Sequence, residues 1–175
     1  MKFGHKKIII LFISSVILAA CGNNAPAKLV EPFKGCKMGK PKPIFELGMA
    51  HISNQKFELQ PEAGVEEVLF DNGNTLTIRQ SGCDVVHQEF NFLMQGDYTK
   101  ASENACMMLA INQLYFLSKI SPKLYGFQGW AQAMEAKIKE IKLAAPFELE
   151  KGFFVKIDKE ATTTEKANFK ITLFQ

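Results

Sequence analysis

The chain has 175 residues, with 21 basic side chains against 18 acidic ones and a formal charge of +3. The whole excess lies in the first twenty residues, where Lys2, Lys6 and Lys7 have no acidic neighbour, so the other 155 residues are balanced at 18 basic and 18 acidic side chains. A chain of that length buries the core of one domain. Its neutrality excludes a general basic footprint for nucleic acid, and we expect no nucleic-acid partner.

The N-terminal segment has the three-part layout of a secretory signal peptide. Its lysines are followed by an uncharged, mostly apolar run from Ile8 to Ala20 and then by Cys21. That run is thirteen residues long, whereas a helix that crosses a bilayer needs about twenty. We therefore predict that residues 1–20 are a leader that is cleaved from the mature protein.

The ending Leu18-Ala19-Ala20-Cys21 resembles the lipobox of bacterial lipoproteins. The resemblance covers the first twenty-two residues and implies that the Cys21 thiol carries diacylglycerol, with a third chain on the new amino terminus. One acyl chain holds a protein only marginally, and two or more hold it stably. An aspartate after the cysteine tends to retain such proteins at the inner membrane, and here the residue is Gly22. The resemblance implies an outer-membrane lipoprotein facing the periplasm in a Gram-negative cell, or one outside the plasma membrane in a Gram-positive cell.

Residues 21–43 are predicted to be a lipidated tether. They are rich in proline, glycine and lysine, a composition typical of linkers. The lysines have two interpretations: they are solvated side chains of a linker, or they contact anionic groups of the membrane surface.

Three cysteines remain for an oxidising compartment, namely Cys36, Cys83 and Cys106. If residues 83–94 form one strand, its ends lie roughly 35 Å apart, and Cys106 follows the far end. A disulfide needs α-carbons within about 7 Å, so we predict a bridge between Cys36 and Cys83 and a free thiol at Cys106. Three buried thiols without a bridge are the alternative.

Apolar and polar residues then alternate with a period of two, which predicts strands. The predicted strands are 44–49, 56–60, 65–70, 75–80 and 83–94. His51 continues the phase of the first strand and is placed on its core side. The turn sequence from Asp71 to Asn74 predicts a hairpin, so we expect an antiparallel meander with one apolar face.

The period changes after Gly96. A helix capped by Asp97 or Thr99 is predicted to run to Ser121, with apolar residues over most of its circumference, as in a helix buried on more than one side. A second helix with one apolar stripe is predicted over 127–144. Three C-terminal strands follow at 147–150, 153–157 and 169–173. The order predicts an α+β domain over residues 44–175, an antiparallel sheet with helices on one face.

Few residues suit catalysis. His87 and Glu89 share one face of a strand, a spacing that serves acid–base chemistry but that a solvent-facing strand also shows. The chain has no G-x-S-x-G motif and no C-x-x-C or H-x-x-x-H spacing for a metal, so a site from His87, Cys83 and Cys106 is not expected. We expect no catalytic residue, metal or cofactor.

Aromatic and methionine side chains allow two interpretations, an ordinary core or a cavity for an apolar ligand. The residues concerned are Phe90, Phe92, Met94, Met107, Met108, Tyr115, Phe116 and Trp130. The turns at 71–74 and 121–126 are candidate partner contacts.

Three functional hypotheses follow. The first is an anchored envelope lipoprotein with a non-enzymatic binding or accessory role, whose partner is an envelope protein or a small apolar molecule. The second is a periplasmic inhibitor or immunity protein against a toxin or lysozyme. The third is a hydrolase that uses His87 and Glu89.

Overall fold

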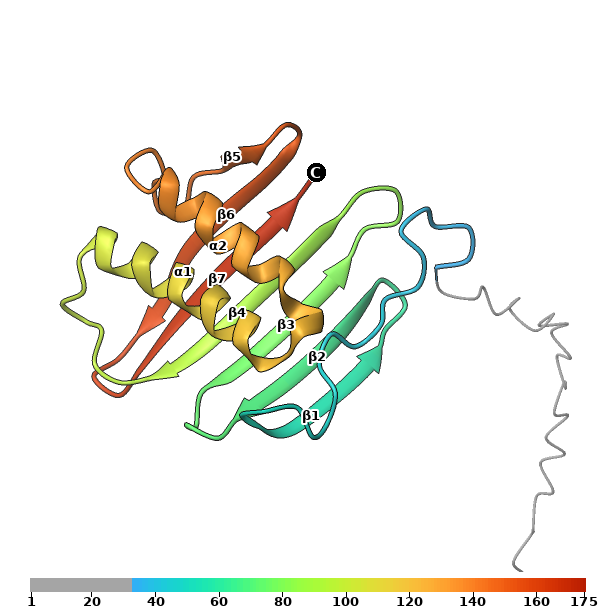
Figure 1. Cartoon of the computed structure of the whole chain (residues 1–175), viewed down its shortest axis with the longest axis horizontal. Coiled ribbons are helices and arrows are strands. Elements are labelled where there is room, and N and C mark those ends of the chain that lie inside the picture. Colours follow the sequence, from blue (N-terminus) through green and yellow to red (C-terminus); the bar gives the residue numbers. More distant parts are fainter. Residues whose placement is uncertain (1–32) are drawn as a thin grey trace, which may run out of the picture.

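A seven-stranded antiparallel sheet carries two α-helices on one of its faces (Figure 1). The computed structural model describes residues 33–175. This architecture confirms the predicted α+β class with helices on one face of an antiparallel sheet. The predicted leader and the lipidation residue Cys21 lie outside the described residues. No helix in the described part of the chain is long and apolar enough to span a membrane.

The first four strands form a meander, and the three C-terminal strands extend the sheet beyond the fourth strand. The elements are β1 (Ile52–Leu59), β2 (Ala63–Phe70), β3 (Thr75–Ser81), β4 (His87–Gln95), α1 (Glu103–Ile120), η1 (Pro122–Leu124), α2 (Gly126–Ala136), β5 (Phe147–Glu150), β6 (Phe153–Thr162) and β7 (Lys166–Phe174). The spatial order is β1-β2-β3-β4-β7-β6-β5, so the last strand pairs with β4 and β5 lies at the edge.

The core lies between the sheet and the helices. Alternate residues of each strand face it, and the central ones are fully buried: Leu76, Ile78, Phe90, Phe92, Val155, Ile157, Phe169 and Ile171. Helix α1 is apolar over most of its circumference because it packs on the sheet and also lies beside α2 (Figure 1). Its N-terminus is capped by Ser102, whose hydroxyl accepts the N–H of Ala105 at 3.2 Å, and not by Asp97 or Thr99.

The predicted strand at 44–49 is wrong. The backbone N–H groups of Ile44 and Phe45 donate to the carboxylate of Glu66 in place of a neighbouring strand, and the pairing of β1 with β2 begins only at Ile52. His51 does not face the core either. It has a positive φ of 64°, and its exposed imidazole contacts the Asp71 carboxylate at 2.9 Å.

Two other predicted elements are longer than the observed ones. β4 begins at His87, because residues 83–86 form the turn that meets the N-terminal segment. Helix α2 ends at Ala136, whereas the predicted helix runs to residue 144. The chain turns after α2 so that Ile141 enters the core at 4% exposure, and the N–H of Ala144 donates to the carbonyl of Ile157 at 2.8 Å.

Candidate functional site

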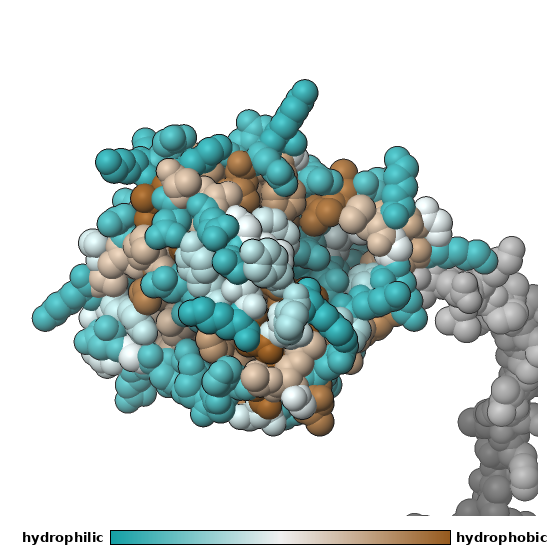
Figure 2. All heavy atoms as spheres, in the orientation of Figure 1, coloured by the Kyte–Doolittle hydropathy of each residue, from teal (hydrophilic) through white to brown (hydrophobic). Residues whose placement is uncertain are grey.

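A cleft of about 310 Å³ lies at the C-terminal end of β3 and the N-terminal end of β4. One wall is the N-terminal segment, and the other is the turn region between these two strands. Its lining residues are Met38, Gly39, Lys40, Pro41, Lys42, Gln80, Ser81, Gly82, Val86, His87 and Gln88. Figure 2 shows the surface hollowed between the helices and the N-terminal segment.

The N-terminal wall is fixed to the sheet by covalent and polar contacts. Cys36 and Cys83 form the predicted disulfide, with their α-carbons 4.5 Å apart. The N–H of Met38 donates to the carbonyl of Cys83 at 3.0 Å, and the amide of Gln80 donates to the carbonyl of Lys42 at 2.7 Å. The predicted tether therefore contacts the domain from Cys36 onward.

Gly64 lets this wall lie close to the sheet. A β-carbon at Gly64 would stand 2.6 Å from the Cβ of Pro41 and 2.9 Å from the ring of Phe57, which is closer than carbon atoms approach. The missing side chain thus leaves room for Pro41 and Phe57 against β2.

The cleft is positively charged. Lys40 and Lys42 line it, and none of its lining residues is an aspartate or a glutamate. Gln80 and Gln88 add amide groups, whereas the Ser81 hydroxyl lies 3.0 Å from Nδ1 of His87 on the opposite face of the sheet. Ammonium and amide donors around a concave surface are groups that bind phosphate and carboxylate.

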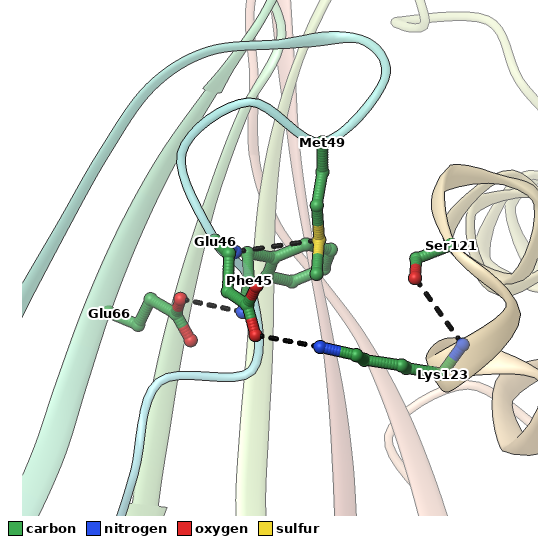
Figure 3. Close-up of polar contacts among 6 residues, drawn as sticks. All are labelled: Phe45, Glu46, Met49, Glu66, Ser121 and Lys123. Atoms are coloured by element: carbon green, nitrogen blue, oxygen red, sulfur yellow. Dashed lines mark hydrogen bonds and ion pairs between the residues drawn. The ribbon is translucent and has the colours of Figure 1, made fainter.

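An apolar groove of about 220 Å³ adjoins the cleft. It lies between Ile44 of the N-terminal segment and the residues of η1 and α2, and Gln88 lines both recesses. Its remaining lining residues are Lys123, Leu124, Gly126, Phe127 and Trp130. Lys123 is the one charged residue among those that line the groove. Its ammonium is paired with Glu46 at 3.1 Å (Figure 3), which neutralises the charge.

Glu66 holds the shared wall of the two recesses, and sequence reasoning missed it. Its side chain is fully buried, and its carboxylate accepts the N–H of Phe45 at 2.9 Å (Figure 3). The same carboxylate accepts the N–H of Ile44 at 2.7 Å and the amide of Gln55 at 2.9 Å. A carboxylate is stable in the core only when such donors surround it. The signal was present in the sequence, because Glu66 stands in the same strand phase as Val68 and Phe70.

The structure places His87 and Glu89 on the open face of the sheet, opposite the helices. Both line a hollow of about 280 Å³ there. Glu89 is paired across the strands with Arg79 and Thr172. In the described part of the chain no carboxylate lies within bonding distance of a His87 ring nitrogen, and the one polar side chain bonded to that ring is Ser81.

Most of the other charges on the open face are neutralised locally. Lys156 pairs with Asp158 at 2.9 Å, and Lys170 pairs with Glu160 at 2.8 Å. The hydrogen bond that the Lys170 ammonium donates to Glu160 raises the pKa of Lys170, and partial burial opposes that shift. Lys156 and Lys170 are therefore neutralised by neighbouring carboxylates.

The structure separates most of the predicted aromatic and methionine cluster from any recess. Phe90, Phe92, Met94 and Met107 are buried in the close-packed core, and only Trp130 of that set lines the apolar groove. Of the turns considered as partner contacts, the one at 121–126 borders this groove through Lys123, Leu124 and Gly126.

Cys106 is a free, buried thiol in α1, as the sequence predicts. Its sulfur lies 3.8 Å from the carbonyl oxygen of Ala101. Within residues 33–175 no three histidine, cysteine or acidic side chains gather as metal ligands would.

Comparison with known proteins supplies no relative. No protein-family model matches the chain, and neither a curated protein nor a solved structure is significantly similar to it.

Proposed function

We propose that this chain is a membrane-anchored envelope lipoprotein whose domain has a non-enzymatic binding role, with the cleft and the adjoining groove as its ligand site. The observation that carries the proposal is the position of that site. The N-terminal segment that comes from Cys21 is fastened at Cys36 to Cys83 and then forms a wall of the cleft.

Chain length keeps the site near the proposed membrane surface. Residues 22–35 separate the proposed lipidation residue from the disulfide, and these fourteen residues extend over at most about 50 Å. A lipid on Cys21 would hold the cleft within that range of the bilayer, on the outer membrane of a Gram-negative cell.

The chemistry of the site supports binding more than turnover. Nucleophilic catalysis needs a base beside the nucleophile and a third group that orients the base. Ser81 and His87 are hydrogen-bonded, but among the described residues no carboxylate is bonded to His87. The cleft nevertheless offers several donors and adjoins an apolar groove, and these features are sufficient for recognition.

A periplasmic inhibitor or immunity protein is the second candidate. The open face of the sheet favours it, because half-buried side chains such as Arg79 and Glu89 lie there without a hydrogen-bond or ion-pair partner among the described residues. A hydrolase that uses His87 and Glu89 keeps one supporting feature, namely that both residues line one hollow.

Fractionation of cells tests the anchor. The native protein is expected in the membrane fraction, with an N-terminal Cys21 peptide whose mass includes acyl chains, whereas Cys21→Ser is expected to stay uncleaved or leave the lipidated fraction. Cys106→Ser is the matched control, because it changes a cysteine that lies in the core. A native polypeptide that begins at Met1, or that has an unmodified thiol at Cys21, would contradict the proposal.

A further inference from the structure

The basic cleft and the apolar groove meet at a single residue, Gln88, and differ in chemistry. On one side of Gln88 lie Lys40 and Lys42 of the N-terminal wall and the amide of Gln80, which donates to the carbonyl of Lys42. On the other side lie the aliphatic and aromatic surfaces of Ile44, Leu124, Phe127 and Trp130. A ligand that satisfies both recesses has an anionic end joined to an apolar end.

The apolar groove has the form of a binding surface for a hydrocarbon chain. Phe127 and Trp130 meet edge to face, with ring centroids 5.4 Å apart. Phe127 is held from below by Phe90 at 5.5 Å. The floor of the groove is therefore rigid, while Trp130 stays half exposed at its rim. Covering this surface removes apolar area from water.

The basic cleft suits a small anionic group. The lysines come from the exposed N-terminal wall and are free to turn toward a ligand, because no hydrogen bond or ion pair engages their amines in the described part of the chain. The amides of Gln80 and Gln88 lie on the strand side. Donors thus face the cleft from both walls.

We propose that the cleft and the groove together bind one anionic amphiphile, a molecule with a phosphate or carboxylate head on an alkyl chain. The head lies between Lys40, Lys42 and the amide of Gln80, and the chain passes Gln88 to lie along Phe127 and Trp130. This inference rests on the proposed binding role and names its ligand class. A membrane at the anchor would supply such molecules within reach of the site.

Trp130 is the only tryptophan of the chain and lines the groove, so its fluorescence reports binding directly. The experiment titrates the mature polypeptide from Gly22 onward, which holds all the residues of the described fold, with dodecyl phosphate below its micelle-forming concentration. A saturable shift of the emission is expected. Inorganic phosphate should leave the emission unchanged, and the neutral dodecyl maltoside should bind about tenfold more weakly.

A second titration with dodecanoate distinguishes the two heads. Tighter binding of dodecyl phosphate assigns a phosphate head, and tighter binding of dodecanoate assigns a carboxylate head. Either order supports the proposal.

Substitutions at two glycines of α2 test the groove without disturbing the core. A β-carbon at Gly126 or at Gly129 meets no atom within 4 Å, so both positions accept a side chain. Gly126 lines the groove and Gly129 does not. Gly126→Phe should therefore abolish the shift caused by dodecyl phosphate, whereas Gly129→Phe should preserve it.

The lysines test the head end. The double variant Lys40→Gln and Lys42→Gln should weaken dodecyl phosphate about tenfold and leave dodecyl maltoside unchanged. Lys56→Gln, an exposed lysine of β1 outside the cleft, is the control.

The proposal is overturned if dodecyl phosphate leaves the emission of Trp130 unchanged, or if Gly126→Phe and Gly129→Phe behave alike in a folded protein. It is also overturned if the double lysine variant binds as the native protein does. If Cys21 is lipidated but dodecyl phosphate does not bind, the anchored role stands and the amphiphile site is refuted. If dodecyl phosphate binds but Cys21 is not lipidated, the amphiphile site stands and the anchor is refuted.

Discussion

The carboxylate of Glu66 accepts the backbone N–H of Phe45 at 2.9 Å, which joins two residues that are 21 positions apart. The same side chain binds the N–H of Ile44 at 2.7 Å and the amide of Gln55 at 2.9 Å. One buried acid thus takes the place of a strand partner for the N-terminal segment. The position of the segment on the sheet, and with it the wall of both recesses, depends on this contact.

Glu66→Gln should lower the free energy of unfolding by about 1.5–3 kcal/mol. The new amide nitrogen would face a backbone N–H, so at least one charge-assisted hydrogen bond is lost and a buried donor stays unsatisfied. Urea unfolding measures the loss, and amide exchange of Ile44 and Phe45 locates it. Glu67→Gln, at the exposed neighbouring position of β2, should change stability by less than about 0.5 kcal/mol. Equal effects of the two variants would disprove the role of Glu66.

Gly64→Ala should cost about 1–3 kcal/mol, because the added methyl group would overlap Pro41 and the ring of Phe57. The control variant, Gly129→Ala in α2, is expected to change the free energy of unfolding in the opposite direction. Its methyl group would meet no atom within 4 Å, and alanine favours a helix over glycine, so the protein should be stabilised by about 0.5–1 kcal/mol. Thermal unfolding of both variants checks the pair. A neutral Gly64→Ala would mean that the N-terminal wall does not lie tightly on β2.

Local pattern predicted the fold class because each element carries its own signal. The Asp71 to Asn74 turn sequence predicted the β2–β3 hairpin, and the period of two predicted the core faces of β3 and β4. The insertion of β7 beside β4 was beyond such reasoning, because that pairing joins residues about eighty positions apart. The predicted strand at 44–49 is wrong for a related reason. Its residues alternate as in a strand, but the N–H groups of Ile44 and Phe45 donate to the buried Glu66 and not to a neighbouring strand.

The candidate site was less predictable than the fold. Its lysines fall in the predicted tether, and the sequence leaves Trp130 with two interpretations, an ordinary core residue or part of an apolar cavity. Only the disulfide between Cys36 and Cys83 pointed to the position of the N-terminal segment, and it was inferred by a distance argument rather than by a motif. The close approach of Pro41 to Gly64 has no local signature, because any glycine in a strand has the same appearance in the sequence.

Replacing the bridge by Cys36→Ser with Cys83→Ser should destabilise the fold by about 2–4 kcal/mol, since the closed loop spans 47 positions and its constraint on the unfolded chain is lost. Urea unfolding measures the change. Non-reducing peptide mapping of the native protein should recover a peptide pair linked through Cys36 and Cys83, with Cys106 as a thiol. A disulfide to Cys106 would refute the observed arrangement.

Tyr115 and Glu135 connect the two helices, and their contact predicts a pH-dependent contribution to stability. The phenol of Tyr115 donates to Oε2 of Glu135 at 2.6 Å, and this hydrogen bond raises the pKa of Tyr115 above its ordinary value of 10.0, with smaller effects from desolvation and the carboxylate charge. A raised pKa means that the folded state favours the protonated phenol. The stabilisation is complete below pH 10 and is lost as the pH rises through the folded pKa. Tyr115→Phe should therefore be less stable than the native protein at pH 7, and the difference should shrink at alkaline pH, measured by urea unfolding at each pH. The difference stays constant if the phenol does not bond to Glu135.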